Sequence, residues 1–168
     1  MGEVIDREYW NNEDGAAVLY TAQKEPVVSH YENFTKSKVT RENDLLLARN
    51  ATPYIYLPKV GSIYTDHVIR AHISKNYDRR FIRYSLRVAA EHIIGNTVTI
   101  PTYSISLWGN RIIVYPSLQE QNEIANYLDK HCQSIDIACQ NIEQEIETLQ
   151  MYKQSLTYEY VTGKKRII

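Results

Sequence analysis

A long heptad stripe near the C-terminal end of this 168-residue chain limits its fold more than any other feature. From residue 128 onward, apolar residues recur at alternating spacings of four and three, which places them in a narrow line along one side of an α-helix. The stripe consists of Leu128, Cys132, Ile135, Cys139, Ile142, Ile146, Leu149, Leu156 and Tyr160, with Lys153 as its charged member. The other faces are rich in Glu and Gln. The pattern therefore predicts a coiled coil, and we expect these nine residues to form a helix dimer interface.

The start of this helix is also marked in the sequence. Ser117 and Glu120 form the Ser-x-x-Glu pattern, in which the hydroxyl and the carboxylate satisfy free N–H groups of the first helical turn. Pro116 precedes the pattern and favours a boundary there. We therefore expect two parts, a globular domain over residues 1–116 and a helical spacer over residues 117–168.

The two cysteines of the chain, Cys132 and Cys139, both belong to the stripe. Seven residues of helix separate them by roughly 10 Å, which is too far for a disulfide within one helix. We interpret them as small apolar residues of the seam, with a crosslink to a partner helix as the alternative. The sequence provides no further ligands that would complete a metal site with them.

The part before the helix combines strand patterns with one helical pattern. Short apolar or alternating runs predict strands at residues 17–21, 45–49, 68–73 and 111–115, a hairpin from 54–57 and 62–64, and an alternating segment at 96–106. From Asp78 to Ile94 the apolar period becomes helical, with Asp78 as the expected N-terminal cap and Gly95 at the end. The predicted fold class is α+β: a globular domain of mixed sheet and helix, followed by a long coiled-coil-forming α-helix.

Charge is distributed unevenly along the chain. Residues 35–116 contain twelve Lys and Arg against five Asp and Glu, whereas the whole chain has a net charge of -1. Arg79, Arg83 and Arg87 follow one another at spacings of four on the expected helix, where like charges cost a few tenths of a kcal/mol per pair. A bound polyanion such as a phosphate backbone would offset this repulsion, and the alternative is a scattered set of solvating side chains.

Candidate DNA contacts follow from the chemistry of these residues. Arginine pairs with guanine, asparagine pairs with adenine, and lysine and arginine bind phosphates. We expect Arg49, Asn50 and Arg70 to contact bases and the basic residues near and on the helix to contact the backbone. The expected DNA-binding set is Arg49, Asn50, Thr52, Arg70, Lys75, Arg79, Arg80, Arg83 and Arg87. The alternative for Arg49 and Asn50 is a strand-end turn whose side chains bond the local backbone.

Motifs for catalysis are missing from the sequence. It has no Gly-rich phosphate loop, no Gly-x-Ser-x-Gly elbow, no His-Glu-x-x-His zinc site and no Asn-Pro-Pro-aromatic stretch. We therefore expect no catalytic residue and no bound metal. The sequence also lacks an apolar run of about 18 residues and a secretory signal, so we expect a cytoplasmic protein without a membrane span.

Two motifs, in this order, resemble the specificity (S) subunit of type I restriction-modification systems. Residues 43–52 resemble the pattern Gly-Asp-(apolar)3-x-Arg-x-Gly-Thr of its target recognition domain, with Asn43 and Ala51 at the two glycine positions. Residues 115–129 resemble the pattern Pro-Leu-x-Glu-Gln-x-x-Ile-Ala-x-x-Leu-Asp at the entry to its conserved helical region. With the terminal segment 161–164, the resemblance covers roughly residues 35 to 164.

The resemblance implies a non-catalytic subunit that recognises double-stranded DNA for a methyltransferase complex. It implies a modification subunit as partner, which carries the S-adenosylmethionine, with a restriction subunit as a further partner of the complex. Complete members have two recognition domains and two helical regions, so this chain resembles a half subunit whose recognition domain is short at the front. A homodimer with antiparallel helices would restore the missing half.

Two other functions remain open from the sequence. The first is a coiled-coil protein-interaction module without DNA specificity, such as an inactive fragment. The second is a standalone nuclease or modification enzyme.

Overall fold

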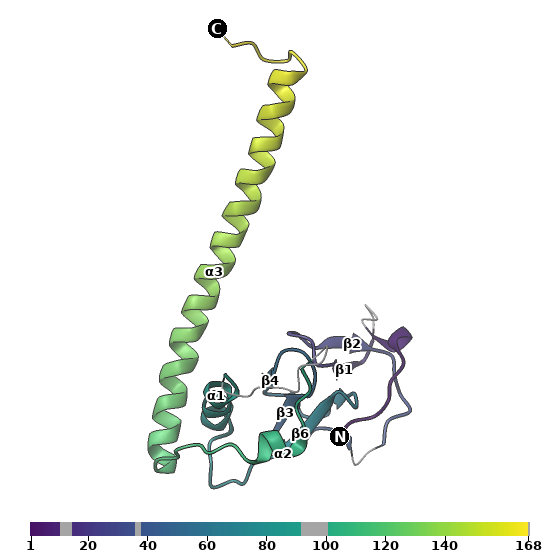
Figure 1. The fold of residues 1–168 in the computed structure, drawn as a ribbon, viewed down its shortest axis with the longest axis vertical. Coiled ribbons are helices and arrows are strands. Elements are labelled where there is room, and N and C mark those ends of the chain that lie inside the picture. The colour runs from purple at the N-terminus through teal and green to yellow at the C-terminus, as the bar shows by residue number, and fades with distance from the viewer. Residues whose placement is uncertain (11–14, 36–37, 92–100, 168) are drawn as a thin grey trace. The chain divides into compact units, whose positions relative to one another are not determined.

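The computed structural model describes residues 1–10, 15–35, 38–91 and 101–167. The chain divides into two compact units, Met1–Ala125 and Asn126–Ile168. The first unit contains two small sheets, the 3-10 helix η1 (Arg7–Tyr9) and the helices α1 and α2. The 44-residue helix α3, Leu118–Val161, begins in the first unit and continues through the second (Figure 1). This architecture confirms the predicted mixed sheet-and-helix domain followed by a long helix.

The first sheet has the strand order β2-β1-β5. Its strands are β1 (Ala17–Tyr20), β2 (Val27–Ser29) and β5 (Ile63–Tyr64). The central strand β1 pairs antiparallel with β2 and parallel with β5, which places Leu19 beside Ile63. Both side chains are buried in one core cluster with Ile5, so the N-terminal segment packs against this sheet.

The second sheet has the order β4-β3-β6, with β3 (Asp44–Ala48) antiparallel to both β4 (Ile55–Tyr56) and β6 (Val68–His72). Every residue of β3 is buried, as expected for the apolar run at its centre. On β6, burial decreases from Val68 to His72, which is exposed. The predicted strands at 17–21, 45–49 and 68–73 are therefore confirmed, each with slightly different ends.

Helix α1 spans Arg79–Ala90 and is capped as the sequence predicts. Asp78 Oδ1 accepts hydrogen bonds from the N–H groups of Arg80 and Phe81 at 2.7 and 3.0 Å. Phe81 and Ile82 are buried against Leu45 of β3 and against Ala125 of α3. The predicted helix end near Ile94 and Gly95 lies outside the described residues.

Three local predictions are wrong. Strands β4 and β5 do not form a hairpin, because β4 joins β3 and β5 joins β1. The turn between them is held instead by Thr40, whose Oγ1 donates to the Lys59 carbonyl at 2.6 Å and accepts from the Ser62 N–H at 2.9 Å. Thr40 thus holds the turn, and the strands before and after it join different sheets.

The other two errors concern the segment before α3. Residues 111–115 form no strand, and Ile112 and Val114 are exposed rather than packed. The helix α2, Ile105–Gly109, occupies the end of the segment expected to alternate as a strand. Ser104 caps α2 by accepting from the Leu107 N–H at 3.2 Å, and Trp108 is buried. A local hydroxyl cap and one buried indole therefore outweigh the strand preference here.

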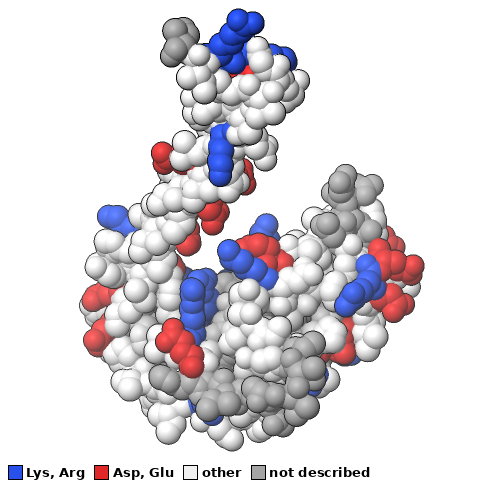
Figure 2. All heavy atoms as spheres, turned by 45° about the horizontal axis from the view of Figure 1, so that its top comes forward, with Lys and Arg blue, Asp and Glu red and all other residues white. Residues whose placement is uncertain are grey.

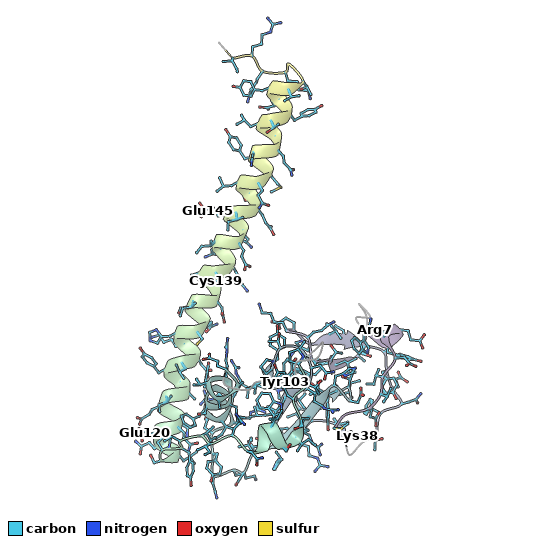
Figure 3. The ribbon with its side chains drawn as sticks, in the orientation of Figure 1. Arg7, Lys38, Tyr103, Glu120, Cys139 and Glu145 are labelled. Carbon is cyan, nitrogen blue, oxygen red and sulfur yellow. The ribbon has the colours of Figure 1, made fainter. Side chains whose placement is uncertain are left out.

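Helix α3 begins at the predicted position. Ser117 Oγ accepts a hydrogen bond from the Glu120 N–H at 3.3 Å, which is one half of the expected capping box. The first turns of α3 contribute the buried residues Gln121 and Ala125 to the first unit. Beyond Ala125, most side chains of the helix, including Cys139 and Glu145, are exposed along its whole length (Figure 3). In the described part of the chain, no helix is both long and apolar enough to cross a membrane.

Candidate nucleic-acid interface

The turn that follows β3, residues 49–52, carries three residues of the expected DNA-binding set. Ala51 has φ of 60°, and Asn43, which immediately precedes β3, has φ of 65°. Both angles lie in the left-handed region that favours glycine. The two positions where the resembling pattern has glycine therefore keep the glycine-like backbone, although other residues occupy them.

Backbone contacts hold this turn from two sides. The Arg49 N–H donates to the His67 carbonyl at 2.9 Å, and the Ala51 N–H donates to the Pro101 carbonyl at 2.9 Å. Tyr103 binds the turn twice, from its N–H to the Arg49 carbonyl at 2.6 Å and from its hydroxyl to the Ala51 carbonyl at 3.0 Å. Tyr103 itself lies within the globular unit (Figure 3). The backbone of the turn is thus fixed before any ligand binds.

The side chains of the turn bond to the segment just before β6. Arg49 Nη1 donates to the Asp66 carbonyl at 3.1 Å, as the strand-end alternative anticipated for this residue. Arg49 Nε is buried and has no hydrogen-bond acceptor among the described residues. The amide nitrogen of Asn50 lies 2.9 Å from Nδ1 of His67. Both side chains are half-buried, so they are oriented by the protein while part of each remains accessible.

Positive charge gathers around this end of the sheet. Burial lowers the pKa of the Met1 amino group, and the nearby charges of Lys38, Arg70 and Arg49 lower it further. A neighbouring cation disfavours a second positive charge, and it attracts an anion for the same reason. Arg49, Arg70 and Lys38 therefore lie close enough to affect one another, while Glu3 and Asp44 pair with Lys38 and Arg70 in the same region.

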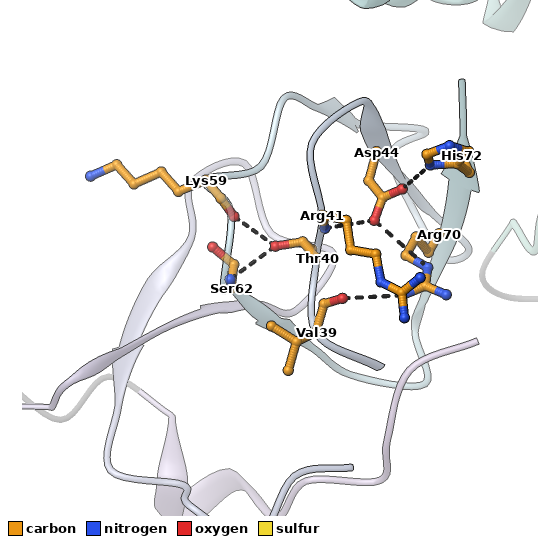
Figure 4. Close-up of polar contacts among 8 residues, drawn as sticks. All are labelled: Val39, Thr40, Arg41, Asp44, Lys59, Ser62, Arg70 and His72. Carbon is orange, nitrogen blue, oxygen red and sulfur yellow. Dashed lines mark hydrogen bonds and ion pairs between the residues drawn. The ribbon is translucent and has the colours of Figure 1, made fainter. Parts of the chain in front are cut away.

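Arg70 belongs to a network around the buried carboxylate of Asp44, which is 1% exposed (Figure 4). Asp44 Oδ1 lies 2.8 Å from His72 Nδ1, and its Oδ2 accepts from the Arg41 N–H at 2.8 Å. Arg70 Nε lies 3.8 Å from Oδ2, and its Nη1 donates to the Val39 carbonyl at 3.1 Å. Because a buried carboxylate requires such partners, Arg70 has a structural role that the sequence did not reveal.

A groove of about 610 Å³ joins the turn to α1. Thr52, Tyr54 and Tyr56 line it on the sheet side, and Arg83 and Arg87 line it on the helix side. The combination offers guanidinium groups for phosphates and aromatic rings for stacking or sugar contacts. The groove thereby brings together three members of the expected set that lie as many as 35 positions apart in sequence.

A second pocket, of about 490 Å³, lies at the start of α1 and collects Lys75, Arg79 and Arg80. Arg80 forms an ion pair with the capping residue Asp78 at 3.0 Å. Burial raises the pKa of the Asp78 carboxyl, but hydrogen bonds from the Arg80 side chain and from the Phe81 and Arg80 N–H groups lower it more, so its pKa lies below the ordinary value. Arg79 Nη1 is buried without an acceptor among the residues that the structure describes.

The expected set is thus divided among four places: the turn, the groove, the pocket at the start of α1 and the Asp44 network. On the face shown in Figure 2, groups of Lys and Arg are separated by Asp and Glu. Within the described ranges, no group of three or more His, Cys, Asp and Glu side chains is placed to hold a metal ion.

Two residues that organise these places were not singled out by the sequence. His67 was one of five scattered histidines, yet it contacts both the backbone and the side chain of the turn. Gln121 is buried and bonds to both Asp78 and Pro116. For Gln121 a signal existed, since it stands in the Glu-Gln pair of the helix-entry pattern. For His67 no sequence signal pointed to the contact.

Comparison with protein families decides the family. Residues 2–148 match the family model described as the type I restriction modification DNA specificity domain. The chain belongs to this family. The match covers the turn, the groove, the second pocket and most of α3, and it confirms the resemblance recognised in the two motifs. The family description, a DNA specificity domain, agrees with a recognition role rather than a catalytic one.

Solved structures with the same fold include three S subunits or complexes. The specificity domain is similar to the type I restriction-modification S subunit of M. genitalium, with 17% identity and a TM-score of 0.58 over 94% of this chain. It is also similar to a structure that concerns complex assembly and conformational transition of the type I R-M system. Here the identity is 15% and the TM-score is 0.65 over 95% of this chain. The HsdS subunit from Thermoanaerobacter tengcongensis matches 82% of this chain, with 16% identity and a TM-score of 0.57.

At these identities the likeness shows a shared fold. The specificity domain spans 41%, 42% and 35% of the three matched chains, so it corresponds to less than half of each. A search of curated proteins finds no match.

Proposed function

We propose that this specificity domain recognises a specific sequence in double-stranded DNA as the non-catalytic subunit of a type I restriction-modification methyltransferase complex. The observation that carries the proposal is the family match over residues 2–148, which includes both the recognition unit and most of α3. Arg83 and Arg87 support it independently, because they line one groove with Tyr54 and Tyr56, a groove that Glu25 and Glu91 also line. Methyl transfer itself would be performed by a modification subunit that binds S-adenosylmethionine, and a restriction subunit would be a further partner. Such a complex acts in the cytoplasm.

The two kinds of surface would divide the work of recognition. Base contacts specify a sequence, while phosphate contacts set position and affinity. Asn50 and Arg49 on the rigid turn are the candidates for base contacts, because their side chains are oriented and partly accessible. Arg83 and Arg87 in the groove are the candidates for phosphate contacts, together with Lys75, Arg79 and Arg80 in the second pocket.

A second copy of the chain would complete the recognition of a bipartite site. On α3, the stripe residues Ile135, Ile142 and Leu149 are 60%, 57% and 58% exposed. Each buried side chain of this kind stabilises an interface by about 1.5–3 kcal/mol. An antiparallel pair would bury the two stripes against each other and relate the two recognition units by a twofold axis. The target would then be two inverted half-sites with a fixed gap.

The length of α3 supports its use as a spacer. From Ser134 to Tyr160 the helix extends about 40 Å at about 1.5 Å per residue. One turn of DNA is about 34–36 Å long. The seam therefore has the dimension needed to hold two recognition units about one turn of DNA apart.

Salt dependence of duplex binding separates this proposal from a pure interaction module. Because DNA binding releases counterions, affinity for duplex should fall steeply as salt rises. Fluorescence anisotropy with a labelled random duplex, measured between low and physiological salt, gives the slope directly. A coiled-coil module without DNA function would show no such binding. Turnover of DNA by the purified chain with magnesium and S-adenosylmethionine alone would contradict the non-catalytic role.

The dimer is tested with one substitution in the stripe and one beside it. Ile142→Lys places a charge in the proposed seam and should convert a dimer to a monomer in sedimentation analysis. Gln144→Lys adds the same charge on a different face of the helix and should leave the mass unchanged. Since lysine has at least as high a helix propensity as isoleucine, loss of helix would not explain the difference. A wild-type monomer at micromolar concentration would contradict the dimer.

A further inference from the structure

His67 connects the proposed base-reading residue Asn50 to a carboxylate. The amide nitrogen of Asn50 lies 2.9 Å from Nδ1 of His67. On the other side of the ring, Nε2 of His67 lies 3.9 Å from Oδ1 of Asp66. Asp66 also anchors Arg49, which donates from Nη1 to the Asp66 backbone carbonyl at 3.1 Å. The three residues form a line that ends at the turn.

The polarity of this line is fixed by simple hydrogen-bond chemistry. An amide nitrogen can only donate, so Nδ1 of His67 must accept and the proton of the neutral ring must be on Nε2. The carboxylate of Asp66, 3.9 Å from Nε2, lies beyond hydrogen-bond distance, but its charge favours the proton on that side of the ring. His67 is therefore held as the tautomer that accepts from Asn50.

This contact determines which atoms of Asn50 are available to DNA. One N–H of the amide is used by His67, which leaves the second N–H and the amide oxygen. Among the described residues, the Asn50 amide has no other hydrogen-bond partner. One donor and one acceptor side by side are what adenine requires in the major groove, where N7 accepts and the N6 amino group donates. If the amide were rotated so that its oxygen faced His67, only its two N–H groups would be available to DNA. It would then have no acceptor for the N6 amino group of adenine.

We propose that His67 is a positioning residue that fixes the orientation of the Asn50 amide and thereby makes the turn specific for adenine at one position of each half-site. The inference rests on the proposed function and goes beyond it, because it assigns a base and the residue that enforces the choice. It also gives a physical role to the rigid backbone of the turn, since a hydrogen-bond edge selects a base only when it is held in place before binding.

The test compares sequence selection by three variants of the complex, captured from cells through a tag on this chain. The wild-type complex selects duplexes from a random library, and sequencing gives the preference at each position. Asn50→Ala identifies the position that Asn50 contacts. His67→Leu and His67→Asn then form a matched pair, because the two residues have similar size but only asparagine offers an oxygen near the place of Nδ1.

The expected result is specific to one position. His67→Leu should lower the preference for adenine roughly tenfold at the position identified by Asn50→Ala and leave the other positions unchanged. His67→Asn should keep the preference, because its side-chain oxygen accepts from Asn50. Circular dichroism of each variant controls for folding.

Each other outcome overturns the inference in a recognisable way. If His67→Leu keeps the adenine preference, or if both His67 variants lose it equally, His67 does not position Asn50, while the proposed function stands. The same holds if the Asn50 position prefers another base or if Asn50→Ala changes no position. If the wild-type complex enriches no sequence at all, the proposed function and this inference both fail.

Discussion

The side-chain oxygen Oε1 of Gln121 accepts a hydrogen bond from the backbone N–H of Asp78 at 3.0 Å, although the two residues are 43 positions apart. The amide nitrogen of Gln121 donates to the Pro116 carbonyl at 2.8 Å, and the residue is 1% exposed. Asp78 is the cap of α1, and Gln121 lies in the first turn of α3. One amide therefore fastens the starts of both helices within the first unit.

This contact predicts a large effect of an apolar replacement. Gln121→Met keeps the volume but leaves the Asp78 N–H and the Pro116 carbonyl without their partner. Both bonds are partly buried, so each unsatisfied group should cost about 1 kcal/mol, the low end for buried groups, and the free energy of unfolding should fall by about 2 kcal/mol. Urea denaturation measures the loss. Gln119→Met, on an exposed residue two positions earlier, should change stability by less than about 0.5 kcal/mol.

The cap of α1 predicts a pH dependence. The pKa of Asp78 is lowered in the folded state, so its contribution is fully present above the unfolded pKa of about 3.9. It is lost as pH falls through the lower folded pKa. Asp78→Asn keeps a neutral capping oxygen but does not titrate. The stability advantage of the wild type over this variant should therefore shrink in denaturation curves below about pH 4, and an advantage that stays constant there would contradict the assignment.

The left-handed backbone of Ala51 predicts a stabilising substitution. At φ of 60° an L-residue is strained by about 1–2 kcal/mol, whereas glycine is not. Ala51→Gly should raise the free energy of unfolding by about 0.5–1 kcal/mol, after the entropy that glycine loses on folding. Ala89→Gly, within α1, should lower it by about 1 kcal/mol. A thermal melt that shows the same sign for both variants would contradict this account.

Most of the fold followed from local patterns. The buried run at Leu45–Ala48, the cap at Asp78 and the start of α3 after Ser117 each depend on residues close in sequence. Strands β4 and β5 join different sheets, and the turn between them is held by Thr40, which is 19 residues from Lys59 and 22 from Ser62. A turn pattern cannot reveal such a contact. The segment at 111–115 misled for a similar reason, since its short apolar run is typical of a strand but has no strand partner in the described chain.

The arginines of α1 that line the groove predict how the salt dependence of DNA affinity should change when they are replaced. Replacing Arg83 and Arg87 by glutamine removes two candidate phosphate contacts. The slope of log affinity against log salt should then become shallower by about 2, while the selected sequence stays the same. Arg7→Gln, which alters an arginine over the Trp10 ring in η1, serves as a control with an unchanged slope. Equal slopes for the double variant and wild type would place the phosphate contacts elsewhere.

The sequence allowed candidate DNA contacts to be chosen by residue type, but it did not predict how these residues are arranged in space. Arg49, Asn50 and the arginines of α1 were chosen for their chemistry, and the structure groups several of them around one turn and one groove. Arg70 shows the limit of that approach, because its guanidinium supports the buried Asp44. The role of His67 depends on the three-dimensional meeting of β3 with the segment before β6, and residue type alone does not encode it.

Methylation mapping in cells that carry the intact complex tests the central claim most directly. We predict a methylated site of two inverted half-sites with a fixed gap, which disappears when this gene is inactivated and returns when it is restored. A single non-palindromic half-site, or a methylation pattern that does not depend on this gene, would contradict the proposal.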